Sequence, residues 1–121
     1  MKRFIRSLGF AAAGLVHALR SERHMRFHLA AAAAVCIVAA KLPLSRTQWA
    51  VLLLAIALVI TAELINTAVE RAVDLISPEL HPLAKLAKDT AAGAVLAAVF
   101  FSVLVGFVIL GPPLWSLLAG K

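Results

Sequence analysis

The chain has 121 residues, of which 63% are hydrophobic and only 15% are charged, and its formal net charge is +6. This composition excludes an ordinary soluble domain and indicates a small integral membrane protein. Its basic residues lie beside apolar segments, without interleaved aromatic residues, so we expect a membrane surface or a phosphorylated ligand as their partner and no nucleic acid. The single cysteine, Cys36, allows no internal disulfide bond.

The first predicted element is an amphipathic helix over about residues 2–20. Apolar side chains such as Phe4 and Leu8 share one face of it, and His17 and Arg20 lie on the other. A secretory signal peptide is the alternative, but His17 and Arg20 interrupt the apolar region and no small-residue cleavage site follows it. We therefore expect this helix to lie along the membrane surface.

Three membrane-spanning helices are predicted next, over about residues 26–42, 48–75 and 83–110. A span must cross about 30 Å of hydrocarbon at about 1.5 Å per residue, so the first span has to begin near Arg26. The third span is predicted to stop at the Gly-Pro-Pro sequence of residues 111–113, because proline resists helical continuation. The expected fold is therefore an all-α integral membrane protein that forms a single domain over residues 1–121.

Lysine and arginine residues are distributed unequally between the two ends of these spans. The N-terminal segment to Arg26 holds six, and the region around the second loop holds three, whereas the other side holds only Lys41, Arg46 and Lys121. By the positive-inside rule, the N-terminus and the loop ISPELHPL face the cytoplasm. We expect a multi-pass membrane protein with a cytoplasmic site.

Acidic and amide residues interrupt the second span as a stripe on one helical face. The stripe is spaced by three, four and four residues and consists of Glu63, Asn66, Glu70 and Asp74. If Trp49 marks one membrane interface, Glu70 reaches the opposite boundary and Glu63 lies about 9 Å inside it. A carboxylate at that depth is costly, which makes it a functional candidate.

This stripe predicts phosphoryl transfer from a nucleotide to a lipid alcohol. Carboxylates such as Glu22, Glu70 and Asp74 suit Mg²⁺, which binds one or two of them together with substrate phosphates. Lys88, beside Asp89, supplies positive charge for phosphate oxygens. Glu63, at the depth of a lipid hydroxyl, is the candidate general base. The sequence has no GxxxxGK[ST] motif and no protein-kinase signature set.

The same residues have other interpretations. Glu63 and Asn66 could serve helix association, Lys88 and Asp89 could be a solvated first turn, and His81 could be an ordinary loop histidine. An ion-conducting or proton-conducting oligomer would also use buried carboxylates, although the apolar run LLLAIALVI offers no polar path. A membrane scaffold without chemistry is a third alternative.

Two segments resemble the prokaryotic diacylglycerol kinase family. They are AELINTAVERAVD (62–74) and HPLAKLAKDTAAGAVL (81–96), accompanied by Glu22, Arg26 and the amphipathic N-terminus in the same order. The resemblance implies a homotrimeric bundle, with sites shared between chains, that phosphorylates a lipid alcohol with ATP and Mg²⁺. A homo-oligomer is also expected because three short helices cannot shield a polar site from lipid.

By position, the resemblance implies roles for individual residues. Glu63 would be the general base, and Glu22 and Glu70 would bind the metal that bridges the ATP phosphates. The residues expected to support the site are Asn66, Asp74, Lys88 and Asp89, with His81 near the nucleotide base.

Two further segments resemble the undecaprenol kinases of Gram-positive bacteria. SPELHPLAK and RSERHMRFHL are more similar to these than to the enterobacterial diacylglycerol kinases, in which an acidic residue occupies the position of His28. We therefore expect undecaprenol as the acceptor, with diacylglycerol as the alternative.

Overall fold

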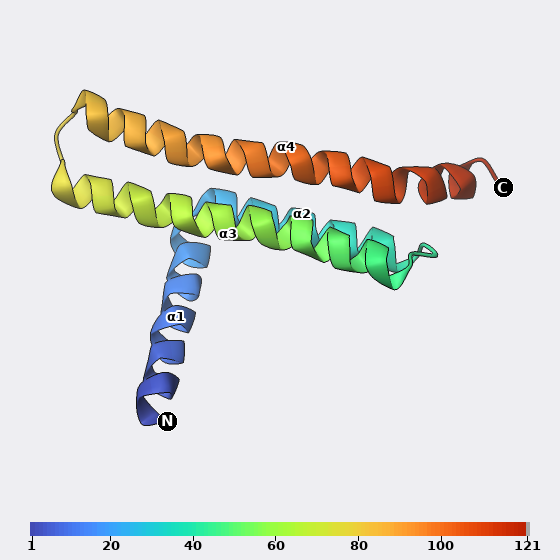
Figure 1. The fold of residues 1–121 in the computed structure, drawn as a ribbon, viewed down its shortest axis with the longest axis horizontal. Coiled ribbons are helices and arrows are strands. Elements are labelled where there is room, and N and C mark those ends of the chain that lie inside the picture. The colour runs from blue at the N-terminus through green and yellow to red at the C-terminus, as the bar shows by residue number, and fades with distance from the viewer. Residues whose placement is uncertain (121) are drawn as a thin grey trace.

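The computed structural model describes residues 1–120, which form four helices. Helices α2, α3 and α4 run side by side, and α1 leaves them crosswise near the start of α2 (Figure 1). The hairpin of α3 and α4 packs along most of its length, and α2 contacts α3. The bounds are α1 Lys2–Ser21, α2 Arg23–Ala40, α3 Arg46–Ile76 and α4 Pro82–Leu118.

Local sequence explains where α3 and α4 begin. Ser45 Oγ accepts a hydrogen bond from the Gln48 backbone N–H at 3.1 Å, and Gln48 Oε1 accepts one from the Ser45 backbone N–H at 2.9 Å. This reciprocal capping box satisfies two N–H groups that the helix itself leaves free. At α4, Pro82 occupies the first helical turn and His81 Nδ1 accepts from the Leu83 backbone N–H at 3.0 Å.

The predicted stop of the last helix at residues 111–113 is wrong, because α4 continues through Pro112 and Pro113 to Leu118. The fixed φ of proline is close to the helical value, and each proline removes only one backbone N–H donor. The carbonyl groups four residues earlier, on Val108 and Ile109, therefore lose their usual helical partners. The surrounding residues still keep the helical conformation.

The packed core is small, and most large apolar side chains are uncovered. Ala39, Leu52 and Ile109 are buried together where α2, α3 and α4 meet, and Trp49 packs against them. Outside this cluster, residues such as Phe107 expose most of their side chains. Both α3 and α4 are long and apolar enough to cross a membrane, and few of their residues are buried within the chain. Their outer faces thus fit a lipid environment.

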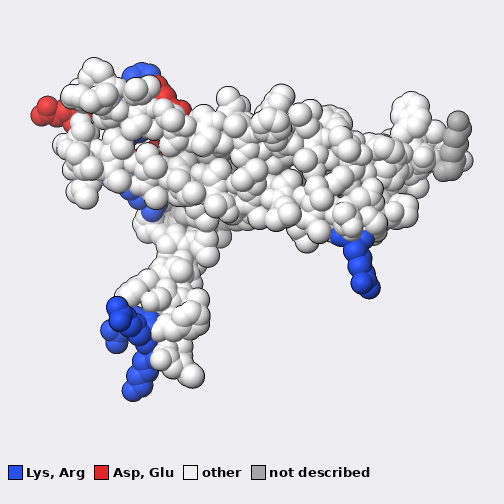
Figure 2. Space-filling view, in the orientation of Figure 1, with Lys and Arg blue, Asp and Glu red and all other residues white. Residues whose placement is uncertain are grey.

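Charged residues are concentrated at the ends of the molecule (Figure 2). Lysine and arginine side chains gather at the free end of α1 and at the two ends of the long body, acidic side chains gather at the end that carries the α3–α4 loop, and the body between its ends is uncharged. The amphipathic helix predicted at the N-terminus is present as α1, and its apolar residues Phe4 and Leu8 are exposed. This arrangement leaves the apolar face of α1 free to contact a membrane.

Candidate active site

The buried polar residues of α3 lie in its second half. Glu63 is 3% exposed, Asn66 8% and Thr67 2%. Thr67 satisfies its own hydroxyl by donating to the Glu63 backbone carbonyl at 3.0 Å. Burying an ionisable carboxyl group is costly, so the chemistry available to Glu63 depends on the groups that surround it.

Glu63 is contacted by a histidine from the neighbouring helix. His28 Nε2 of α2 lies 3.6 Å from Glu63 Oε2, and the side chains are 14% and 4% exposed. From the sequence, His28 is expected only to distinguish undecaprenol kinases from enterobacterial relatives, and its contact with the candidate base comes from the structure. The signal in the sequence is a histidine directly before the apolar run of α2, but no spacing rule pairs residues on different helices.

One turn further along α3, Asn66 and Glu70 form a pair. Asn66 Nδ2 donates to Glu70 Oε1 at 3.2 Å. Asn66 Oδ1 is buried and has no hydrogen-bond donor within residues 1–120. An unpaired buried acceptor costs about 1–3 kcal/mol, so this oxygen is suited to a donor supplied from outside the chain.

The helix hairpin brings a lysine to the end of the acidic stripe. Lys88 Nζ of α4 forms an ion pair with Asp74 Oδ1 of α3. Asp89 instead pairs with Lys85 Nζ of its own helix at 2.5 Å. The predicted positive charge therefore lies beside the acidic stripe, and Asp74 connects the two.

Glu22 lies at the corner between α1 and α2, where it is the one non-helical residue. It makes no ion pair in the part of the chain that the structure describes. Its position is nevertheless linked to α3, because Arg71 Nη2 donates to Ser21 Oγ at 2.6 Å. This bond joins the residue before Glu22 to the residue after Glu70.

Other polar contacts hold the corner in place. Arg26 Nη1 donates to the backbone carbonyls of Leu19 at 3.2 Å and Arg20 at 2.7 Å. These bonds satisfy carbonyl groups at the end of α1 that the helix leaves unpaired. Arg26 therefore has a structural function in fixing the direction of α1.

The remaining predicted site residue, His81, caps α4 through Nδ1 and is exposed. No three or more His, Cys, Asp or Glu side chains among residues 1–120 are grouped to bind a metal ion together. The structure thus brings together three sets of residues: Glu63 with His28, Asn66 with Glu70, and Asp74 with Lys88.

Comparison with known proteins covers this whole region. Residues 9–110 match the family model described as prokaryotic diacylglycerol kinase. The chain is 43% identical to undecaprenol kinase of Bacillus subtilis over 94% of its own length and 93% of that protein. It is 45% identical to a diacylglycerol kinase of Synechocystis over 93% of its own length and 65% of that protein. It is 31% identical to diacylglycerol kinase of Escherichia coli K12 over 94% of its own length and 90% of that protein.

Proposed function

The chain belongs to the prokaryotic diacylglycerol kinase family, and from that membership we propose that it transfers the γ-phosphate of ATP to undecaprenol. It is a lipid kinase, as its named relatives are. The observation that carries the proposal is Glu63, a carboxyl group 3% exposed within an apolar helix bundle. The Bacillus subtilis relative, which the alignment covers over 93% of its length, favours undecaprenol. Diacylglycerol is the second candidate, favoured by the names of the other relatives.

The buried carboxylate of Glu63 is the general base. It takes the proton from the lipid hydroxyl while the hydroxyl oxygen attacks the γ-phosphorus, and ADP leaves with the electrons of the broken P–O bond. His28, 3.6 Å from Glu63 Oε2, holds the carboxylate in one orientation. Positioning of this kind supplies much of the catalysis in phosphoryl transfer, which requires little covalent chemistry from the protein.

The nucleotide lies along the more exposed end of the stripe. Glu22 and Glu70 would hold Mg²⁺, because a set of two carboxylates suits an ion whose other ligands are water and phosphate oxygens. When bound, the ion neutralises charge on the phosphates. Lys88 contacts phosphate oxygens, and Asp74 holds its ammonium group in place.

Three further residues complete the nucleotide site. The unpaired Asn66 Oδ1 accepts a hydrogen bond from a ligand donor. Asp89 orients the first turns of α4 through its pair with Lys85. Since His81 Nδ1 accepts the α4 cap, its Nε2 is left protonated as a donor to the nucleotide base.

The assembly is a homotrimer with three spans in each chain. Helix α2 has 18 residues, or about 27 Å, and lies alongside α3. Its basic first turn can extend to the headgroups and allow it to cross. The extensive exposed apolar surface of α3 and α4 favours burial against further copies, and the family resemblance makes three copies. The basic side chains of α1 favour a cytoplasmic N-terminus and active site in the inner membrane.

The decisive experiment is phosphoryl transfer by purified protein in lipid vesicles. With γ-labelled ATP and Mg²⁺, we expect label in undecaprenyl phosphate, and less in phosphatidic acid when diacylglycerol is supplied instead. Absence of label from both lipids would refute the lipid kinase. Ion flux through the same vesicles without nucleotide would instead support the conducting oligomer.

A further inference from the structure

One polar side chain, Arg71, links the corner between α1 and α2 to α3. Its Nη2 donates to Ser21 Oγ at 2.6 Å, and Ser21 Oγ in turn donates to the His17 carbonyl at 2.8 Å. The serine hydroxyl thus uses its single proton within α1 and offers a lone pair to the guanidinium group. Among residues 1–120, no other side-chain hydrogen bond joins α1 to α3.

The end of α1 is a favourable place for a positive charge. Ser21 is the last residue of this helix, where unpaired backbone carbonyls carry the negative end of the helix dipole. Arg26 supplies one guanidinium group there, through its bonds to the Leu19 and Arg20 carbonyls. Arg71 supplies a second, but it belongs to α3 and not to the corner itself. Arg26 therefore fixes the angle of the corner, and Arg71 fixes its place on α3.

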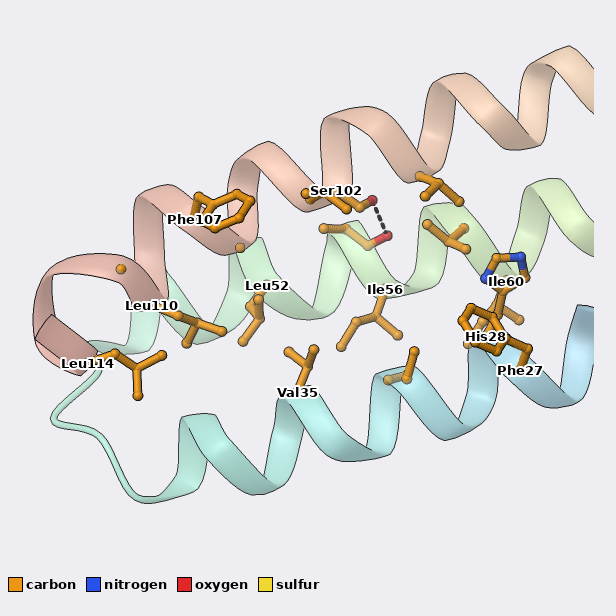
Figure 3. Close-up of a pocket in the computed structure, with 18 residues that line it drawn as sticks. Phe27, His28, Val35, Leu52, Ile56, Ile60, Ser102, Phe107, Leu110 and Leu114 are labelled. Carbon is orange, nitrogen blue, oxygen red and sulfur yellow. Dashed lines mark hydrogen bonds between the residues drawn. The ribbon is translucent and has the colours of Figure 1, made fainter. Parts of the chain in front are cut away.

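Helix α3 is a firm point of attachment because it is bonded to α4 at two levels. In the apolar interior, Ser102 Oγ of α4 donates to the Ala55 carbonyl of α3 at 3.0 Å (dashed in Figure 3). Nearer the corner, Lys88 of α4 pairs with Asp74, three residues after Arg71. A segment bonded to Arg71 is therefore held relative to both helices.

The Arg71–Ser21 bond lies between the two proposed metal ligands in sequence terms. Ser21 immediately precedes Glu22, and Arg71 immediately follows Glu70. Both carboxylates are partly buried, and Glu22 makes no ion pair among residues 1–120. The location of Glu22 thus depends on the backbone of the corner, and the bond fixes this backbone relative to α3.

We propose that Arg71 is a positioning residue for phosphoryl transfer, which holds Ser21 and so fixes Glu22 relative to the Glu70 carboxylates of the assembly. The inference rests on the proposed function and adds to it a residue that acts through the corner. In a symmetric assembly, a corner fixed on its own α3 has a defined position relative to every copy of α3. The role is therefore the same whether the two ligands of a site come from one chain or from two. Carboxylates already in place bind an ion at a lower cost in ordering.

Two substitutions break the bond from opposite ends. Arg71→Ala removes the donor, whereas Ser21→Ala removes the acceptor and keeps the guanidinium charge. We expect each to raise the Mg²⁺ concentration for half-maximal activity about threefold to tenfold, as for the loss of one exposed hydrogen bond. The KM for undecaprenol should change by less than about twofold, because contacts to the acceptor are retained.

Three further variants serve as controls. Ser21→Thr keeps the accepting hydroxyl and should restore the wild-type Mg²⁺ dependence. The double variant Arg71→Ala/Ser21→Ala should be no worse than either single variant, because both act on one bond. Arg46→Ala removes an arginine from the opposite end of α3 and should match the wild type. If Arg71 bound a phosphate directly, Arg71→Ala alone would be impaired, with a raised KM for ATP, and the proposal would be overturned.

The position of the corner can be measured without metal or nucleotide. Spin labels on Ala13→Cys of α1 and Leu75→Cys of α3, both exposed positions, report the distance between these helices by pulsed electron paramagnetic resonance. The background is Cys36→Ala, and unlabelled chains are added in excess so that an assembly holds one labelled chain. We expect a narrow distance distribution in the otherwise unchanged chain and a broader or shifted one in both bond-breaking variants. Identical distributions would overturn the proposal.

Binding of Mn²⁺ alone separates this inference from the proposed function. In nonionic detergent without nucleotide, the resonance of free Mn²⁺ gives the Kd of the wild type, Glu22→Gln and Arg71→Ala. We expect the Kd to rise in both variants, and an unchanged Kd in either would overturn the proposal. If Arg71→Ala fails to assemble, Ser21→Ala provides the same comparison. If the wild type phosphorylates no lipid, the proposed function fails, while the Mn²⁺ and distance measurements still decide whether Arg71 positions Glu22.

Discussion

The imidazole Nε2 of His28 lies 3.6 Å from Glu63 Oε2, and this contact joins α2 to α3 inside the apolar bundle. Both side chains are largely withdrawn from solvent. The histidine that the sequence resemblance leads us to expect in undecaprenol kinases therefore lies next to the candidate base. A change at His28 alters the surroundings of Glu63 directly.

Replacement of His28 tests whether it positions the base. We expect His28→Leu to lower kcat about 100-fold, because a small misplacement of a reacting group can cost that much. His28→Gln keeps a hydrogen-bonding group and should recover at least part of the loss. Equal kcat in both variants and the wild type would show that the contact has no catalytic effect. Steady-state kinetics with undecaprenol provides the measurement.

Glu63→Gln removes the base while keeping the shape of the side chain. We expect kcat to fall by about two to four powers of ten, the usual contribution of a general base. Glu79→Gln is the matched control, because Glu79 is an exposed loop residue of α3–α4. A Glu63→Gln enzyme with kcat within threefold of the control would exclude Glu63 as the base.

Glu22→Gln and Glu70→Gln test the proposed metal ligands. Each variant loses one of two charged oxygen donors, so we expect the Mg²⁺ concentration for half-maximal activity to rise about tenfold or more. Titration of activity with Mg²⁺ at constant free ATP measures this shift. An unchanged Mg²⁺ dependence in both variants would contradict the assignment.

Mixing these two variants tests whether sites are shared between chains. If Glu22 of one copy and Glu70 of another build one site, then co-refolded Glu22→Gln and Glu70→Gln chains contain some sites with both carboxylates. We expect activity in the mixture well above that of either variant alone. Activity no greater than the average of the two would place both residues of a site in one chain.

Lys88→Ala tests the phosphate contact. A hydrogen bond to a charged group contributes about 1.5–3 kcal/mol, which predicts a rise of about tenfold or more in KM for ATP. Thermal stability should change little, because Lys88 and Asp74 are 39% and 62% exposed and exposed ion pairs contribute at most about 1 kcal/mol. Lys41→Ala, at the α2–α3 turn, is the control. A large loss of stability with normal KM would make the pair structural.

The arrangement of polar residues along α3 could be predicted because it depends on helical periodicity alone. Spacings of three and four residues place Glu63, Asn66 and Glu70 on one face, and the structure pairs Asn66 with Glu70. The contact between His28 and Glu63 could not be predicted in this way. It depends on how far α2 and α3 are displaced along each other, which the packing around Ala39 and Leu52 determines.

The end of α4 shows a different limit of prediction from sequence. Pro112 and Pro113 are helix breakers by local preference, but α4 continues past both to Leu118. Local rules consider only the lost hydrogen bonds and the crowding at each proline. In an apolar setting, leaving the helix would expose still more unpaired backbone groups, so continuation has the lower cost.

The one-residue corner at Glu22 constrains how the chain can vary in length. Its extended backbone (φ −106°, ψ 113°) separates two helices that end at Ser21 and begin at Arg23. One alanine inserted into α1 just before Ser21 would turn everything N-terminal to it by about 100° around the helix axis. The face of α1 that carries Phe4 and Leu8 would then be turned away from its present direction relative to α2, although its composition would be unchanged. The corner thus sets the rotational phase of α1 relative to the rest of the molecule.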